Sequence, residues 1–278
     1  MRYSEAELLL KRAGIENAAY DAAEIFCRLG GVSRASLRFE KDRDVDDDRL
    51  TEAVRRRCER EPLQYILGEW DFFGLTFEMN ENCLCPRPDT EVLVEQTLLR
   101  LPRGARMLEL CTGSGCIPIS VCHSREDVSA ISTDIFPETL ALAERNAVRN
   151  GVVDRISFRL SDVFSPEGLD ADGLFDAIVS NPPYIRSDVI ETLMPEVRDH
   201  DPCMALDGTA DGLYFYRRII EESEHYLKRG GQLFFEIGHD QAEEVSALMQ
   251  SHGYKEIEVK KDYAGLDRVV IGTFLGGK

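Results

Sequence analysis

Apolar residues recur every three or four positions through the first 68 residues, with almost none of the alternation that a strand shows. That period is typical of helices with one buried face. Ser4 and Glu7 have the spacing of a capping box, so we expect Ser4 to cap the first helix. We expect the helices at about 5–13, 18–29, 33–39 and 48–60. The chain therefore begins with a small all-helical domain.

Between residues 69 and 82 the pattern changes to alternating aromatic and polar positions, which predicts a short hairpin that joins two domains. From Arg106 onward, apolar strands alternate with amphipathic helices, the order typical of a doubly wound α/β sheet. Glycines at 230, 231 and 253 are expected to end helices before the strands that follow. The strands are expected at about 106–110, 128–133, 156–160, 174–180, 232–237, 255–260 and 268–274. The helices of this region are expected at about 89–100, 115–124, 137–149, 211–228 and 239–251.

Charge and hydropathy argue against nucleic-acid and membrane partners. The formal net charge of −18 repels a phosphate backbone over most of the surface, so a direct nucleic-acid partner is disfavoured. Arg55, Arg56 and Arg57 form a local basic strip on the predicted helix 48–60, and we interpret it as a solvated helix face. No segment approaches the ~20 apolar residues needed to span a bilayer, so we expect a cytosolic protein without a membrane partner.

The eight cysteines are scattered, and none forms a Cys-x-x-Cys unit. Cys83-Leu84-Cys85 is too short for a zinc knuckle, and the five histidines have no ligand spacing. We therefore expect thiols in a reducing compartment and no metal site.

A rigid tetrad, Asn181-Pro182-Pro183-Tyr184, directly follows the apolar strand at 174–180. The prolines fix φ and remove backbone donors, so the loop presents carbonyl oxygens. A planar NH2 group has two N–H donors, which the Asn181 side-chain oxygen and a proline carbonyl can accept while Tyr184 lies flat against the group. An ordinary proline-rich turn is the alternative for the tetrad taken by itself.

Three other strand ends carry residues suited to a nucleoside. The stretch 111–115 contains two glycines, which let a ligand approach the backbone at the carboxyl end of a strand. Asp134 can accept both hydroxyls of a ribose, and Asp162 can accept an adenine amine. Pro118 stands where the dinucleotide fingerprint has its third glycine, so pyrophosphate binding is disfavoured. Together these positions predict a pocket for an adenosine without phosphates, which S-adenosylmethionine fits.

With these motifs in place, the chain resembles the HemK-type protein-(glutamine-N5) methyltransferases, which modify release factors, over nearly its full length. Pro86-Arg87-Pro88-Asp89-Thr90-Glu91 is a sharp marker of that family, whereas Asn-Pro-Pro-Tyr marks amino methyltransferases broadly. The matching stretches are 62–68, 86–91, 112–115, 180–184, 205–208, 236–238 and 261–268.

The resemblance implies a class I S-adenosylmethionine-dependent methyltransferase domain with a mostly parallel seven-stranded sheet, preceded by a small all-α domain and a hairpin linker. The implied boundaries are 1–68 for a substrate-recognition domain, 69–86 for the linker and 87–278 for the methyltransferase domain. The implied reaction moves a methyl group from S-adenosylmethionine to the N5 amide nitrogen of the glutamine in the Gly-Gly-Gln motif of peptide chain release factors. That methylation modulates translation termination, and we expect a monomer.

The resemblance also assigns residues. The catalytic residues are Asn181, Pro182 and Tyr184, and the same three bind substrate together with Pro183, Arg87, Pro88 and Thr90. The cofactor-binding residues are Glu109, Thr112, Gly113, Ser114, Gly115, Asp134, Ile135, Asp162, Val163 and Asn181. The chain departs from the family at two positions: Cys111 stands where the family usually has glycine, and Cys85 replaces an aliphatic residue.

Three alternatives stay open. An adenine N6 methyltransferase acts on an exocyclic amine with the same two donors, although such enzymes need a basic target-recognition region and a flipped-base pocket. Glutamine methylation of a ribosomal protein uses the same chemistry. A catalytically idle binding protein could keep the fold as a scaffold, because fold alone does not settle function.

Overall fold

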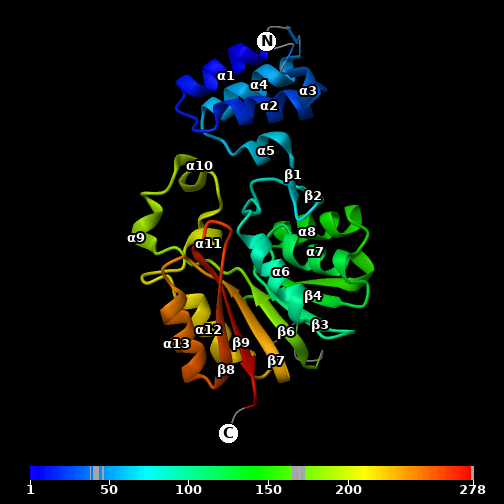
Figure 1. Ribbon diagram of the computed structural model, residues 1–278, viewed down its shortest axis with the longest axis vertical. Helices are drawn as coiled ribbons and strands as arrows, with labels where there is room; N and C mark the ends of the chain where they lie inside the picture. The colour runs from blue at the N-terminus through cyan, green and yellow to red at the C-terminus, as the bar shows by residue number, and fades with distance from the viewer. Residues whose placement is uncertain (38, 40–43, 46, 165–168, 170–172, 277–278) are drawn as a thin grey trace. The chain divides into compact units, whose positions relative to one another are not determined.

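The computed structural model describes residues 1–37, 39, 44–45, 47–164, 169 and 173–276 (Figure 1). The chain divides into two compact units, each described here by itself. The first unit comprises Met1–Trp70, Met79–Glu81 and Leu193–Asp201. The second unit comprises Asp71–Glu78, Asn82–Thr192 and Pro202–Lys278. A short segment from beyond the tetrad therefore belongs to the first unit.

The first unit is built of helices around an apolar core. Tyr3 packs edge-on against Phe26 with ring centroids 5.9 Å apart, and Leu10, Ile25 and Leu50 are fully buried. The helices are α1 (Tyr3–Arg12), α2 (Ala18–Arg28), α3 (Arg34–Leu37), α4 (Asp48–Cys58), α5 (Leu63–Leu67) and α10 (Pro195–Arg198). The four helices predicted before residue 60 are confirmed, although residue 38 of the predicted third helix lies outside the described residues.

Two details of the first unit differ from expectation. Ser4 does not cap α1, because the helix starts earlier and Arg2 is its N-cap, with the Arg2 backbone N–H donating to Glu5 Oε2 at 3.0 Å. Helix α5 was not predicted, because five residues are too few to establish a period. It starts after Pro62 and ends at Gly68, whose φ of 72° closes the helix in the left-handed region.

The interpretation of the arginine strip as a solvated face is wrong for Arg57. Its side chain is only 9% exposed, and Nε donates to Asp21 Oδ2 on α2 at 2.6 Å. Nη2 donates to Glu196 Oε1 on α10 at 2.9 Å. Two acidic partners distant in sequence therefore compensate the desolvation cost of burying the guanidinium. Arg55 does lie on the surface, paired with Glu52.

The predicted hairpin is confirmed. Strands β1 (Glu69–Phe72) and β2 (Leu75–Glu78) pair in a two-stranded sheet. Phe73 and Gly74 make the turn with φ values of 51° and 76°. Two successive positive φ values are those of the two-residue turn that matches the twist of a hairpin.

In the described part of the second unit, seven strands form one sheet of order β5-β4-β3-β6-β7-β9-β8. Every neighbouring pair from β5 to β7 is parallel, and only β9 runs antiparallel to its neighbours. The mostly parallel doubly wound sheet is confirmed. The strands are β3 (Arg106–Leu110), β4 (Ser129–Asp134), β5 (Ile156–Leu160), β6 (Phe175–Ser180), β7 (Leu227–Glu236), β8 (Tyr254–Lys261) and β9 (Asp267–Phe274).

Helices cover both faces of this sheet: α12 and α13 lie on one side, and α7 and α8 lie on the other (Figure 1). The long helices are α6 (Thr90–Arg100), α7 (Cys116–Ser124), α8 (Pro137–Arg149), α12 (Tyr214–Ser223) and α13 (Ala242–Ser251). The short ones are η1 (Val153–Arg155), α9 (Ser187–Ile190) and α11 (Cys203–Leu206). Large apolar side chains such as Phe175, Phe234 and Tyr216 fill the core.

The predicted helix 211–228 is too long at both ends, and the prediction that glycines 230 and 231 end it is wrong. Strand β7 already begins at Leu227, and both glycines lie inside it. Gly230 has a φ of 84°, and the register between β6 and β7 shifts at this point. The pair therefore forms an irregularity in a strand rather than a cap. Gly253, with φ of 86° between α13 and β8, does separate a helix from a strand as predicted.

The sheet order places two loops side by side. Strands β3 and β6 are neighbours, with Leu110 opposite Ser180 at their carboxyl ends. From β3 the chain winds outward through β4 and β5, and from β6 it winds the other way through β7. Open α/β sheets bind ligands at such a switch point. The glycine loop after β3 and the tetrad after β6 meet there.

All eight cysteines are thiols rather than disulfides. Within the described residues, no helix has the length and apolar character to cross a bilayer. The same residues contain no group of three or more His, Cys, Asp or Glu side chains suited to a metal ion.

Candidate active site

A cavity of about 290 Å³ lies in the second unit at the carboxyl ends of the parallel strands. Most of the predicted site residues line it: Arg87, Thr90, Thr112, Gly113, Ser114, Asp134, Ile135, Asp162, Val163, Asn181 and Pro183. The structure thus brings together predicted residues from five separate segments of the chain. Five predicted residues are not part of the lining, namely Pro88, Glu109, Gly115, Pro182 and Tyr184.

The loop after β3 turns tightly through three left-handed residues. Cys111, Gly113 and Gly115 have φ values of 63°, 55° and 78°. A side chain in that region strains the backbone, so Cys111 is held in a conformation that glycine would adopt without strain. A Cβ on Gly115 would lie 2.9 Å from Ile119 Cδ1 and 3.1 Å from Ala143 Cβ, so Gly115 also allows the loop to pack against α7 and α8. A Cβ on Gly113 would have no described atom within 4 Å other than those of the residue itself and its two chain neighbours.

These two glycines give a matched pair of variants. Gly113→Ala introduces backbone strain alone, which costs about 1–2 kcal/mol. Gly115→Ala adds overpacking against Ile119 and Ala143, which costs a further ~1–3 kcal/mol. We expect urea unfolding to show a larger loss of stability for Gly115→Ala. Equal losses for the two variants would mean that the contact with α7 and α8 has no energetic weight.

Glu109 lies beneath the loop rather than in the cavity. It is fully buried, and the Thr112 and Ser132 hydroxyls both donate to its Oε2. Its Oε1 has no hydrogen-bond partner among the described residues. Burial raises the pKa of Glu109 to about 8. Because Thr112 belongs to the loop and Ser132 to β4, their shared contact with Glu109 ties the base of the loop to β4.

Glu109 should make stability fall with pH. Because its pKa in the fold is above its ordinary value of about 4.5, the folded chain keeps a proton that the unfolded chain has lost, and stability declines until the pH passes about 8. Glu109→Gln removes this decline. We expect the melting temperature of Glu109→Gln, relative to the unmodified protein, to be at least ~3 °C higher at about pH 9 than at about pH 5. The control Glu126→Gln, at an exposed position, should show no such difference.

Asp134 and Asp162 occupy the two acidic positions predicted for a nucleoside. The Asp134 carboxylate accepts from the backbone N–H groups of Gly113 at 3.1 Å and Phe136 at 3.2 Å, and burial raises its pKa. Asp162 is half exposed, and its Oδ1 accepts from Arg218 Nη1 at 2.9 Å. Both carboxylates line the same cavity.

Helix α12 contributes residues that the sequence analysis missed. Tyr214, Phe215 and Arg218 all line the cavity, and the Arg218 guanidinium lies 5.7 Å from the centroid of the Tyr214 ring. The signal was the i, i+4 spacing of an aromatic residue and a cation, which places both on one helix face. Such pairs are common on solvated helices, so the spacing alone did not point to a site.

The composition of the lining tests which cofactor fits. Its charged residues are Arg87, Arg218, Asp134 and Asp162, and Asp162 already neutralises Arg218. A di- or triphosphate needs several free donors, whereas acidic acceptors suit hydroxyl and amine donors. Apolar side chains such as Ile135, Phe136 and Val163 supply contact for a flat base. The residues present therefore fit S-adenosylmethionine.

The cavity is also lined by four cysteines, namely Cys83, Cys85, Cys111 and Cys116. Burial raises the pKa of Cys111 and of Cys116 to about 12. A thiol with such a pKa stays protonated near neutral pH and is a poor nucleophile. Cys111 and Cys116 are therefore suited to a site that holds an alkylating cofactor.

The tetrad is held from both ends. Ser180 Oγ donates to the Leu110 carbonyl at 2.9 Å, which ties the start of the loop to β3. Asn181 Nδ2 donates to Thr90 Oγ1 at 3.5 Å. The Tyr184 hydroxyl donates to Glu236 Oε1 at 3.5 Å, and its carbonyl accepts from Gln241 Nε2 at 3.0 Å. These contacts leave the Asn181 side-chain oxygen available to an N–H donor.

The stretch 205–208 packs against the end of the tetrad. Ile185 forms a parallel bridge with Asp207, so this stretch runs beside the end of the tetrad. A Cβ on Gly208 would lie 2.7 Å from Tyr184 Cα, and one on Gly212 would lie 2.5 Å from the Tyr184 carbonyl oxygen. Both glycines therefore permit close packing against the tyrosine backbone.

Both units match models of known protein families. A family model described as the PrmC N-terminal domain matches residues 3–68, and one described as the methyltransferase small domain matches residues 88–196. The crystal structure of a methyltransferase from Pyrococcus furiosus covers 74% of this chain and 91% of its own, with a TM-score of 0.55 and 21% identity, which supports the fold alone.

Two curated relatives carry the comparison further. The release factor glutamine methyltransferase of Fusobacterium nucleatum is 41% identical over 268 residues, which are 94% of this chain and 75% of that protein. The release factor glutamine methyltransferase of Geobacter sulfurreducens is 40% identical over 266 residues, covering 95% of this chain and 92% of that protein. With its fold, its cavity and its tetrad, the chain belongs to the family of release factor glutamine methyltransferases.

Proposed function

We propose that this S-adenosylmethionine-dependent methyltransferase methylates the side-chain amide nitrogen of the glutamine in the Gly-Gly-Gln motif of a peptide chain release factor and so modulates translation termination. The observation that carries the proposal is the position of Asn181, whose amide nitrogen is turned to Thr90 beside the cavity that Asp134 and Asp162 line. The names of the curated relatives support the choice of substrate.

In the reaction, the chain presents hydrogen-bond acceptors to the substrate amide and fixes the orientation of its nitrogen. When bound, S-adenosylmethionine supplies an electrophilic methyl group, and S-adenosylhomocysteine is left. An amide nitrogen is a weak nucleophile because its lone pair is delocalised into the carbonyl. Asn181 Oδ1 and the Pro182 carbonyl accept its two N–H bonds, which raises electron density on nitrogen and orients it. Placement supplies several kcal/mol of the barrier reduction, and no strong base is required.

Other residues have supporting tasks in this proposal. Tyr184 lies flat against the substrate amide, while Arg87, Pro88 and Thr90 border the place where it enters. Asp134 accepts from the ribose, and the free oxygen of Asp162 accepts from the adenine. Glu109 and Gly115 act from behind the cavity by shaping the loop after β3.

The division of labour along the chain is part of the same proposal. Residues 1–68 recognise the release factor, residues 69–86 link, and residues 87–278 perform the transfer. We further propose that the enzyme acts as a monomer in the cytoplasm, where release factors work, without binding nucleic acid or membrane. The acidic chain supports the absence of a nucleic-acid partner.

Transfer of labelled methyl from S-adenosylmethionine tests the substrate. The panel contains an intact release factor, a factor whose Gly-Gly-Gln glutamine is replaced by alanine, total ribosomal protein and DNA. We expect label on the intact factor alone. Label on ribosomal protein or on DNA would favour one of the other methyl acceptors, and label on none would support a binding protein.

A further inference from the structure

Glu236 is a buried carboxylate behind the tetrad, and the mechanism above gives it no task. It ends β7, the strand next to β6, and is only 2% exposed. Its Oε1 accepts from the Tyr184 hydroxyl, whereas its Oε2 has no hydrogen-bond partner among the described residues. A buried carboxylate with an oxygen unpartnered is costly to the fold. Its presence at this place therefore needs a reason other than stability.

A hydrogen-bonded chain connects Glu236 to the proposed substrate acceptor. Thr90 lowers the pKa of the Glu236 carboxyl by donating its side-chain hydroxyl to it, and Thr90 Oγ1 accepts from Asn181 Nδ2 at 3.5 Å. A carboxylate only accepts, so the hydroxyl proton of Thr90 points to Glu236 and its lone pairs face Asn181. The nitrogen of the Asn181 amide is then drawn to Thr90. Its oxygen is the atom left for the cavity.

We propose that Glu236, as a carboxylate, is a positioning residue for methyl transfer: acting through Thr90, it sets which end of the Asn181 amide faces the substrate. A protonated Glu236 can donate to Thr90 instead, which frees the Thr90 hydroxyl to donate to Asn181 Oδ1. The amide then turns its nitrogen to the cavity. A donor at that place repels the N–H groups of the substrate.

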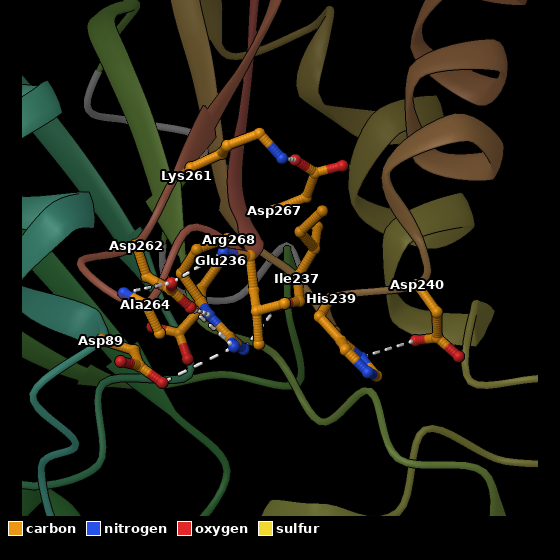
Figure 2. A network of polar contacts seen from close by, with 12 residues as sticks. Asp89, Glu236, Ile237, His239, Asp240, Lys261, Asp262, Ala264, Asp267 and Arg268 are labelled. Atoms are coloured by element: carbon orange, nitrogen blue, oxygen red, sulfur yellow. Dashed lines mark hydrogen bonds and ion pairs between the residues drawn. The ribbon is translucent and has the colours of Figure 1, made fainter.

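The charges around Glu236 decide when it is ionised. Arg268 of β9 lies 3.5 Å from Asp89, which precedes α6, and 3.2 Å from Asp262. Figure 2 shows Arg268 between these two carboxylates and beside Glu236. The titratable and charged groups that interact with Glu236 from the surrounding elements are Asp89, Cys116, Tyr184, Tyr216 and Arg268. Burial raises the pKa of Glu236 to about 7, although Arg268 lowers it. Glu236 therefore changes charge within the pH range in which enzymes commonly work.

Kinetic measurements test this relay, in which Glu236 acts through Thr90 on Asn181. This experiment rests on the proposed function. We expect Glu236→Gln to lower kcat about ten- to a hundredfold near pH 8, with little change in the KM for release factor or the Kd for S-adenosylmethionine. The unmodified enzyme should lose kcat as pH falls through about 7, and Glu236→Gln should lack that decline. Thr90→Val should resemble Glu236→Gln, whereas Thr90→Ser, which keeps the hydroxyl, should restore most of the rate.

The double variant separates a relay from two independent effects. If Glu236 acts through Thr90, Glu236→Gln combined with Thr90→Val should be no slower than the slower single variant. Multiplied losses, an unchanged kcat in Glu236→Gln, or an equal loss of cofactor affinity would overturn the inference. Absence of transfer by the unmodified enzyme would count against the proposed function instead.

A second measurement needs no substrate. In protein labelled with nitrogen-15 asparagine, the side-chain amide signal of Asn181 is identified by its loss in Asn181→Ala. We expect this signal to titrate with a midpoint near pH 7 and to stop doing so in Glu236→Gln. A signal that does not respond to pH in the unmodified protein, or that titrates equally in both, would contradict the relay whatever the substrate is.

Discussion

Replacing Asn181 with alanine should lower kcat about a hundredfold or more while leaving most of the affinity for S-adenosylmethionine. The side-chain oxygen of Asn181 is the proposed acceptor for the substrate amide, and its nitrogen is already engaged by Thr90. Removal of one aimed acceptor in a site that excludes water has an effect of that size. Single-turnover transfer measures the chemical step, and calorimetry measures cofactor binding.

The matched variant for this prediction is Asn181→Asp. It has nearly the same volume and keeps an acceptor oxygen, so it should retain more of the rate than Asn181→Ala. Near-normal turnover in Asn181→Ala would rule out the role of the residue. A loss of cofactor binding as large as the loss of rate would assign Asn181 to the cofactor rather than to the substrate.

Asp21→Ala should lower the free energy of unfolding of the first unit by about 3 kcal/mol or more. Asp21 and Arg57 are each only 9% exposed in their side chains, with 2.6 Å between Asp21 Oδ2 and Arg57 Nε. Loss of one partner leaves a buried guanidinium with Glu196 as its remaining carboxylate. Trp70 is the single tryptophan of the chain and packs against the core of this unit, so its fluorescence reports the transition in urea.

Glu52→Ala is the control for Asp21→Ala. Glu52 pairs with Arg55 on the surface of α4, where both side chains are 55% exposed, and such pairs contribute ~0–1 kcal/mol. A midpoint for Asp21→Ala that matches the control would mean that the buried pair does not stabilise the unit. A change confined to signals of the second unit would contradict the assignment of Arg57 to the first.

Local pattern was enough to predict the sheet and the cavity. The central strands β3, β6 and β7 carry apolar runs, and the carboxyl ends of parallel strands meet at one edge, so Asp134, Asp162 and Asn181 could be placed together from the sequence. The prolines after Asn181 have few backbone conformations, which made the tetrad easy to recognise.

Features that depend on distant partners could not be predicted. The burial of Arg57 needs Asp21 and Glu196, which are remote in sequence. The glycines of β7 follow a helix in sequence, and only the register shift against β6 shows them to be part of a strand. From the sequence, Glu236 is only the last residue of an ordinary strand. The fold is needed to show that Thr90 and Tyr184 lie at its side chain.

Mass spectrometry of a modified release factor tests the central claim most directly. The factor is incubated with the enzyme and with S-adenosylmethionine that carries a deuterated methyl group, then digested and fragmented. We expect the methyl group on the side-chain nitrogen of the glutamine in the Gly-Gly-Gln motif and no label on that peptide when Asn181→Ala replaces the enzyme. A methyl group on any other residue, or an unmodified glutamine after full turnover, would contradict the proposal that this site acts on that amide.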